Sequence, residues 1–265
     1  MRYYNVLKKT YPNGTCQYTL YHYPITYDTE KVDTSELEKQ FDNINFSDNF
    51  DEKPKNDVKN MLDSDRRALK KIYDYARSNA WDYFVTFTFS KDVCNRYSYN
   101  DVTKKLKIYL NHLSQRKCDK HLKYLLVPEL HQDGAIHFHG FFSNLPLALL
   151  TYTGKTDNVG RSIFRINNYN LGASNVTKIS DSKRAATYIC KYVTKGTHSI
   201  LKGKNHYLAS RNLDIPKIEK MNNDVQGLFD YLKNKIEYSW GTTKSFCLNG
   251  KNLIYDIVEM NESEE

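Results

Sequence analysis

Apolar and polar residues recur along the chain at two spacings, one typical of strands and one typical of helices. Alternating residues at 3–7 and 16–23, joined around Pro12-Asn13-Gly14, predict a β-hairpin near the start. Helical spacing of apolar residues predicts helices over 57–78 and 101–116. Dense aromatic and β-branched residues predict a buried strand at 81–90, and two further strands, 122–130 and 135–142, flank the turn HQDG.

The second half of the chain continues the mixed pattern. We expect loops over 145–170, a short strand near 173–179 and a helix over 181–196, with Ser180 or Asp181 as its N-cap and Gly196 just past its end. The stretch to about Lys220 is irregular, and a last amphipathic helix is predicted near 224–238. Because neighbouring strands are joined by turns, the sheet should be antiparallel, with helices packed on it, in the α+β class.

Composition divides the chain into three predicted regions. Residues 1–55 contain the hairpin and an acidic linker, 56–200 a core domain, and 201–265 a C-terminal extension with a helix. Nine acids and two bases lie between Asp28 and Glu52, so this stretch carries −7 while the whole chain carries +8. The remainder, about +15, is a candidate binder of polyanions.

Aromatic residues are abundant among these cations. The 22 Tyr and 12 Phe beside Lys and Arg suit a single-stranded nucleic acid, whose bases stack on rings while its phosphates meet positive charge. A surface that is simply rich in Tyr and Lys would have the same composition, so composition alone leaves both interpretations open.

Cysteines and apolar runs indicate the compartment. The five cysteines are scattered without a CxxC pair, which predicts neither a disulfide framework nor a thiolate zinc site. The N-terminus has no apolar signal core, and no apolar run approaches the roughly 18 residues of a membrane span. We therefore expect a reduced, cytoplasmic setting and no membrane partner.

The segment AIHFHGFF, residues 135–142, places two imidazoles in an otherwise apolar strand. Side chains alternate across a strand, so His137 and His139 share one face while Phe138 occupies the other. A three-residue loop ending at Gly134 would pair Glu129 with His137, whereas a four-residue loop would turn Glu129 away.

With the three-residue loop, two imidazoles and one carboxylate form a three-ligand metal site with open positions. Histidines that are paired for structural reasons are the alternative interpretation. His131, at the turn, is a candidate extra ligand, or a residue that supports the site or contacts DNA.

The helix predicted after Asp181 carries a second candidate group. Tyr188 and Tyr192 are four residues apart, Lys195 continues the same stripe, and Lys191 lies beside it. Tyrosine can act as a covalent nucleophile, but its ordinary pKa near 10 means that a charge or a metal must help it to lose its proton. Tyrosines that serve packing or the surface would give the same spacing.

Three motifs together resemble those of the HUH endonucleases, specifically the rolling-circle replication initiator (Rep) proteins of single-stranded DNA phages and plasmids. They are FVTFTF at 84–89, ELHQDGAIHFHG at 129–140 and YICKYVTK at 188–195, in the order of that family, and SRNLDIP at 210–216 is similar more loosely. The resemblance covers roughly residues 80–200. It implies an antiparallel central sheet with flanking helices, on a ferredoxin-like or RRM-like core.

The resemblance also implies roles for individual residues. His137 and His139 match the metal ligands and Glu129 the third ligand, while Tyr188 matches the nucleophile. Lys191 would place the phosphate or the metal, and Tyr192 matches the second tyrosine of two-tyrosine initiators. The family uses Mg²⁺ or Mn²⁺, although ligation rich in histidine would by itself equally permit zinc.

The implied activity is that of a metal-dependent nickase and ligase. The enzyme would cleave single-stranded DNA or an origin hairpin, attach the 5′ end to tyrosine, release a 3′-OH and later rejoin strands. No GxxxxGK[ST] loop is present, so a helicase of the host or replicon, and a polymerase, are implied partners in a bacterial cytoplasm. Alternatives are an HUH transposase or relaxase, a non-catalytic DNA-binding protein on the same scaffold, and a metallohydrolase that uses water.

Overall fold

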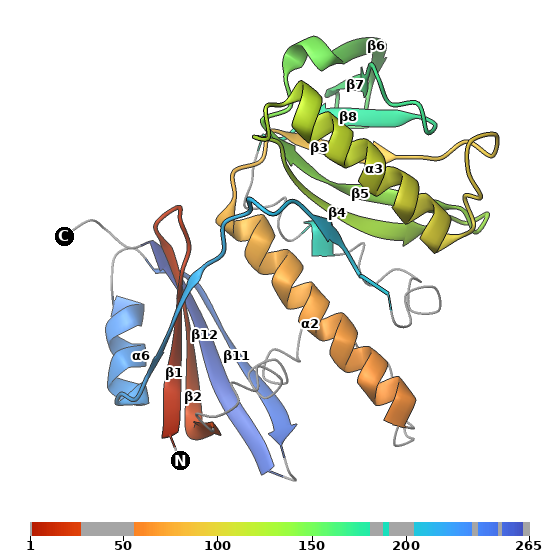
Figure 1. Ribbon diagram of the computed structural model, residues 1–265. Coiled ribbons are helices and arrows are strands. Elements are labelled where there is room, and N and C mark those ends of the chain that lie inside the picture. Colours follow the sequence, from red (N-terminus) through yellow and green to blue (C-terminus); the bar gives the residue numbers. More distant parts are fainter. Residues whose placement is uncertain are drawn as a thin grey trace. The chain divides into compact units, whose positions relative to one another are not determined.

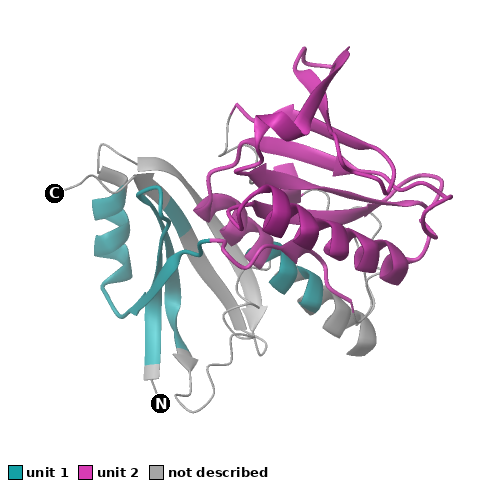
Figure 2. Ribbon diagram, turned by 45° about the horizontal axis from the view of Figure 1, so that its top comes forward, with its two compact units in different colours: residues 1–70, 214–265 teal, residues 71–213 magenta. Residues whose placement is uncertain are grey.

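The computed structural model describes residues 2–27, 56–180, 188–190, 204–234, 238–248 and 251–261. The predicted acidic linker, 28–55, and most of the predicted helix 181–196 lie outside them. The chain forms two compact units, residues 1–70 with 214–265 and residues 71–213 (Figure 2). Both contain an antiparallel sheet, and helices accompany the strands, which confirms the predicted α+β class. No helix within the described ranges is long and apolar enough to cross a membrane.

The first unit combines strands from both ends of the chain. Its five-stranded sheet has the order β10-β1-β2-β12-β11. The strands are β1 (Arg2–Thr10), β2 (Thr15–Tyr27), β10 (Lys217–Met221), β11 (Tyr238–Leu248) and β12 (Lys251–Asn261). Helix α6 (Val225–Asn234) contributes Leu232 to an apolar cluster with Val6, Leu20 and Val258.

The predicted hairpin at the N-terminus is present as β1 and β2. Two long strands, β11 and β12, differ from expectation, because the pattern at the end of the chain predicts only a helix and an acidic stretch. The division into 1–55, 56–200 and 201–265 stays a prediction as a set of boundaries. The structure adds that strands from the first and the last of these regions share one sheet.

The second unit is built on a seven-stranded sheet in the order β6-β7-β8-β3-β5-β4-β9 (Figure 1). These strands are β3 (Tyr83–Phe87), β4 (Lys123–Leu130), β5 (Ile136–Ser143), β6 (Leu150–Thr156), β7 (Ser162–Ile166), β8 (Ser174–Lys178) and β9 (Leu208–Ala209). Helix α2 (Asn56–Ser78) enters this unit at Lys71, α3 (Tyr99–Lys117) connects β3 to β4, and a 3-10 turn, η1 (Leu147–Leu149), precedes β6.

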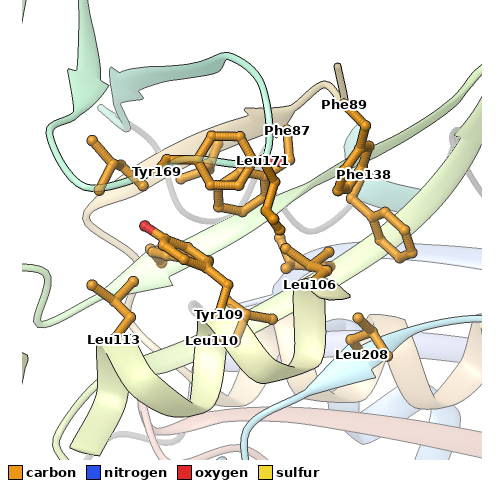
Figure 3. Packing of buried hydrophobic residues seen from close by; sticks show 14 of the residues in the cluster. Phe87, Phe89, Leu106, Tyr109, Leu110, Leu113, Phe138, Tyr169, Leu171 and Leu208 are labelled. Carbon is orange, nitrogen blue, oxygen red and sulfur yellow. The ribbon is translucent and has the colours of Figure 1, made fainter. Parts of the chain in front are cut away.

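Helix α3 covers one face of this sheet. Its buried residues Leu106, Leu110 and Leu113 belong to the same core as Phe87 and Phe138 from the central strands (Figure 3). The helix begins where Ser98 caps it, because the Ser98 side chain accepts a hydrogen bond from the Asp101 amide. Since strands alternate, burying Phe138 on this face directs His137 and His139 to the opposite face.

The expectation of loops over 145–170 is wrong, because β6 and β7 form a hairpin there. Most side chains of this hairpin are exposed or half-buried, so the apolar alternation that reveals a strand is weak. Gly154 and Gly160 both have positive φ, and such glycines are equally typical of loops. The stretch before Lys220 likewise contains β9 and β10 rather than only irregular chain.

Candidate active site

The β4–β5 hairpin brings Glu129 opposite His137 and Val127 opposite His139. The turn is the predicted three-residue loop: the His131 amide donates to the Ala135 carbonyl at 2.8 Å. Gly134 has a φ of +81°, the left-handed conformation that this loop requires. The register on which the three-ligand interpretation depended is therefore confirmed.

His139 is contacted at both ring nitrogens. Its Nε2 lies 2.7 Å from Oε2 of Glu129, and its Nδ1 lies 3.1 Å from the hydroxyl of Thr86, on the neighbouring strand β3. The side chains of His139 and Glu129 are only 11% and 19% exposed, so water screens their interaction weakly. The two contacts fix the orientation of the imidazole.

His137 lies beside this pair but is oriented differently. Its ring stacks on His131, with centroids 4.8 Å apart, and lies 6.3 Å from the His139 ring. Burial, and then the neighbouring His131, lower the pKa of His137 below its ordinary value. The neutral imidazole, which is the form that binds metals, is thereby favoured.

The turn residues hold His131 in place. Asp133 accepts hydrogen bonds from the Ala135 amide at 3.0 Å and from Nδ1 of His131 at 3.1 Å, and it forms an ion pair with Arg96 at 3.1 Å. The stack of His131 on His137 thus rests on a fixed support.

The donor atoms have the chemistry of a metal site without its closed geometry. Glu129 and His139 direct an oxygen and a nitrogen at each other, a combination suited to Mg²⁺, Mn²⁺ or Zn²⁺. Among the residues that the structure describes, no group of three or more His, Cys, Asp or Glu side chains is arranged to hold a metal ion. Two donors converge, and His137 would have to leave its stack to complete the set.

Tyr188 lies on the same face as the histidines. It belongs to a short described helical segment, 188–190, in which Ile189 is fully buried while Tyr188 is 45% exposed. The Tyr188 ring contacts Phe84 with centroids 5.5 Å apart, and Phe84 in turn stacks near His139 at 6.2 Å. Phe84 therefore joins the candidate nucleophile to the candidate ligand.

The other groups of this helix are placed differently. Burial raises the pKa of the Cys190 thiol to about 12, which makes it a poor nucleophile. Lys191, Tyr192 and Lys195 lie outside the described residues, so their predicted roles stay predictions.

Two residues of the site were not assigned roles from the sequence. Thr86 and Phe84 stand in the motif FVTFTF, but only the pairing of β3 with β5 shows that Thr86 lies opposite His139 and Phe84 opposite Phe141. Their two-residue spacing was the available signal, since it places both side chains on one face.

A comparison with protein families finds that residues 82–197 match a family model of replication-associated proteins, the ORF2 type. The matched segment contains the β4–β5 hairpin, Thr86, Phe84 and Tyr188. Comparisons with curated proteins and with solved structures gave no match.

Proposed function

We propose, from this similarity to replication-associated proteins, that the chain is a replication initiator that nicks and rejoins single-stranded DNA through a phosphotyrosine. The observation that carries the proposal is the contact of Phe84 with both His139 and Tyr188. It brings a phenol and a partly buried His–Glu pair to one sheet face within the matched segment. Acting together, these groups suit transfer of a phosphoryl group to tyrosine.

The proposed metal is Mg²⁺ or Mn²⁺. Glu129 and His139 would supply the first two donors, and His137 the third after it leaves His131. The bound cation would polarise a non-bridging oxygen of the scissile phosphate. The low pKa of His137 favours this role, because a neutral imidazole need not lose a proton to bind.

In the proposed reaction the phenolic oxygen of Tyr188 attacks the phosphorus of the scissile phosphodiester. A bond from this oxygen to phosphorus forms, and the bond from phosphorus to the 3′ oxygen breaks. The phenol gives up its proton and the departing 3′ oxygen gains one, so a free 3′-OH remains for priming. One ester replaces another, and the reverse step can therefore rejoin the strand.

The chain's own residues divide the remaining tasks. Phe84 and the buried Ile189 keep the Tyr188 ring at the site while its exposed edge is open to DNA. Lys191 is the proposed phosphate contact, and Tyr192 the proposed second nucleophile. The substrate is single-stranded DNA or an origin hairpin, and the helicase and polymerase come from the host or the replicon, in the bacterial cytoplasm.

The test is a covalent-adduct assay. The chain is incubated with Mn²⁺ and with single-stranded DNA of the replicon that encodes it, labelled at the 3′ end, and separated under denaturing conditions. We expect a labelled protein band that Tyr188→Phe abolishes and that chelation of the metal prevents. Tyr152→Phe is the matched control, because Tyr152 is equally exposed, at 50%, but lies on β6.

The proposal fails if the wild type forms no adduct or if Tyr188→Phe forms it undiminished. Tyr192→Phe then decides the second tyrosine, since loss of strand rejoining with an intact first cleavage would assign it to the second transfer.

A non-catalytic DNA-binding protein is the second candidate. It is favoured by one observation, that the described side chains form no three-donor metal group. Such a protein would bind the same DNA, give no adduct with any divalent cation, and lose no affinity on chelation.

A further inference from the structure

The face that carries the histidines continues across three more strands toward the β6 edge of the sheet. Thr86 pairs with His139 on one side and with Asn175 of β8 on the other. Phe164 of β7 pairs with Val176, so the next residue, Arg165, lies beside Asn175. Residues paired on neighbouring strands point to the same face, so Arg165 lies in one row with His139.

This row is open and polar. Asn175, Arg165 and its partner Thr151 of β6 are exposed, and Thr86 is half-buried. At a strand spacing of about 4.8 Å, Arg165 stands three strands, or ~14 Å, from His139 along the sheet. No residue of the row is acidic.

Arg165 is the one cation of the row, and no ion pair holds it among the side chains that the structure describes. Arg161, at the tip of the same hairpin, differs in this respect. Its Nε lies 2.7 Å from Asp157, which neutralises its charge. Two arginines four residues apart therefore provide a free charge and a compensated one.

We infer that single-stranded DNA leaving the site runs along this row, and that Arg165 binds a phosphate a few nucleotides from the scissile bond. The inference rests on the proposed function for the identity of the substrate. An exposed guanidinium suits phosphate, and hydroxyl and amide groups suit the sugar–phosphate backbone. Phe84, in the adjacent row, offers a ring for a base. A strand entering this site must be unpaired, because a duplex would hold its bases stacked away from the face.

The test measures binding without cleavage. Fluorescence anisotropy of a labelled thymidine oligonucleotide of about 30 nucleotides, longer than one binding site, is followed in EDTA over a range of salt concentrations. For Arg165→Gln we expect roughly fivefold weaker binding at about 0.1 M salt, and a slope of log K against log salt that is shallower by about 0.7, the value for one phosphate contact. Arg165→Lys should keep the wild-type slope.

Arg161→Gln is the matched control and should bind like the wild type. The inference is overturned if Arg165→Gln binds like the wild type, if Arg161→Gln weakens binding as much, or if the wild type does not bind the oligonucleotide. Circular dichroism checks that each variant is folded, and Asn175→Ala, expected to weaken binding without changing the salt slope, probes the row at a second position.

The two proposals fail separately. Absence of a covalent adduct with an intact Arg165 effect would refute the nuclease and leave the DNA row standing. Adduct formation with no Arg165 effect would do the reverse.

Discussion

At the scale of single residues, the contact between Thr86 and His139 supports the site most directly. A histidine that binds a metal through one nitrogen is oriented by the hydrogen bond at its other nitrogen. Thr86 occupies that position at 3.1 Å from Nδ1, while Nε2 faces Glu129. A hydroxyl can both donate and accept, so it suits either tautomer of the ring.

Thr86→Val should therefore weaken metal binding while preserving the shape of the side chain. Removal of such a supporting partner typically costs 10- to 100-fold in affinity, and we expect a loss in this range, measured by titration of Mn²⁺ with electron paramagnetic resonance. Thr88→Val is the control, because Thr88 lies on the same chain segment and its hydroxyl donates to the Ala173 carbonyl. Equal losses in the two variants would refute the supporting role of Thr86.

His137 gives the site a dependence on pH. Because burial lowers its pKa, the folded protein binds fewer protons there than the unfolded chain does. Its contribution to the free energy of unfolding is thus largest well above the ordinary histidine pKa of about 6.5 and falls as the pH drops through and below that value.

Chemical denaturation at several pH values between about 5 and 8 checks this expectation in the metal-free protein. The wild type should lose more stability toward acid than His137→Gln does. A loss of the same size in both proteins would show that other groups cause it.

At the scale of elements, the pairing of β4 and β5 depends on a glycine. A Cβ added at Gly140 would lie 1.9 Å from the Leu125 carbonyl oxygen, which is backbone and cannot turn aside. The strands would have to separate at the position between Phe141 and His139. The close approach of this pair of strands is therefore built into the sequence that carries the histidines.

Gly140→Ala should destabilise the protein by about 3 kcal/mol, the upper end of typical overpacking costs, as measured by denaturant unfolding. Gly154→Ala is the control, since it has a positive φ but nothing within 4 Å of the added Cβ. Strain alone should cost about 1 kcal/mol there. A smaller effect at Gly140 than at Gly154 would contradict the steric account.

The same elements show what could be predicted from sequence. The turn at Gly134 fixes the register of β4 and β5 locally, so the opposition of Glu129 and His137 followed from a few adjacent residues. The place of Thr86 did not, because it depends on pairing with a strand 53 residues away. The β6–β7 hairpin was missed because exposed strands at a sheet edge have little apolar pattern to recognise.

At the scale of the whole molecule, two compact units should unfold separately. Chains of several units commonly depart from two-state unfolding. Differential scanning calorimetry should therefore show two transitions. Leu20→Ala, in the apolar cluster of the first unit, should lower one of them by roughly 10 °C and leave the other in place. Gly140→Ala should lower only the other transition, and a single transition that moves with both variants would contradict this independence.

The pairing of β2 with β12 has a consequence for biosynthesis. Thr15 pairs with Asn261 and Tyr21 with Tyr255, so β2 waits for its neighbour until nearly the whole described chain has left the ribosome. The strands of the second unit, from β3 to β9, are all made before that moment. On a nascent chain this unit can fold first, while the exposed edge of β2 depends on the hairpin with β1 and on chaperones to avoid pairing with another polypeptide.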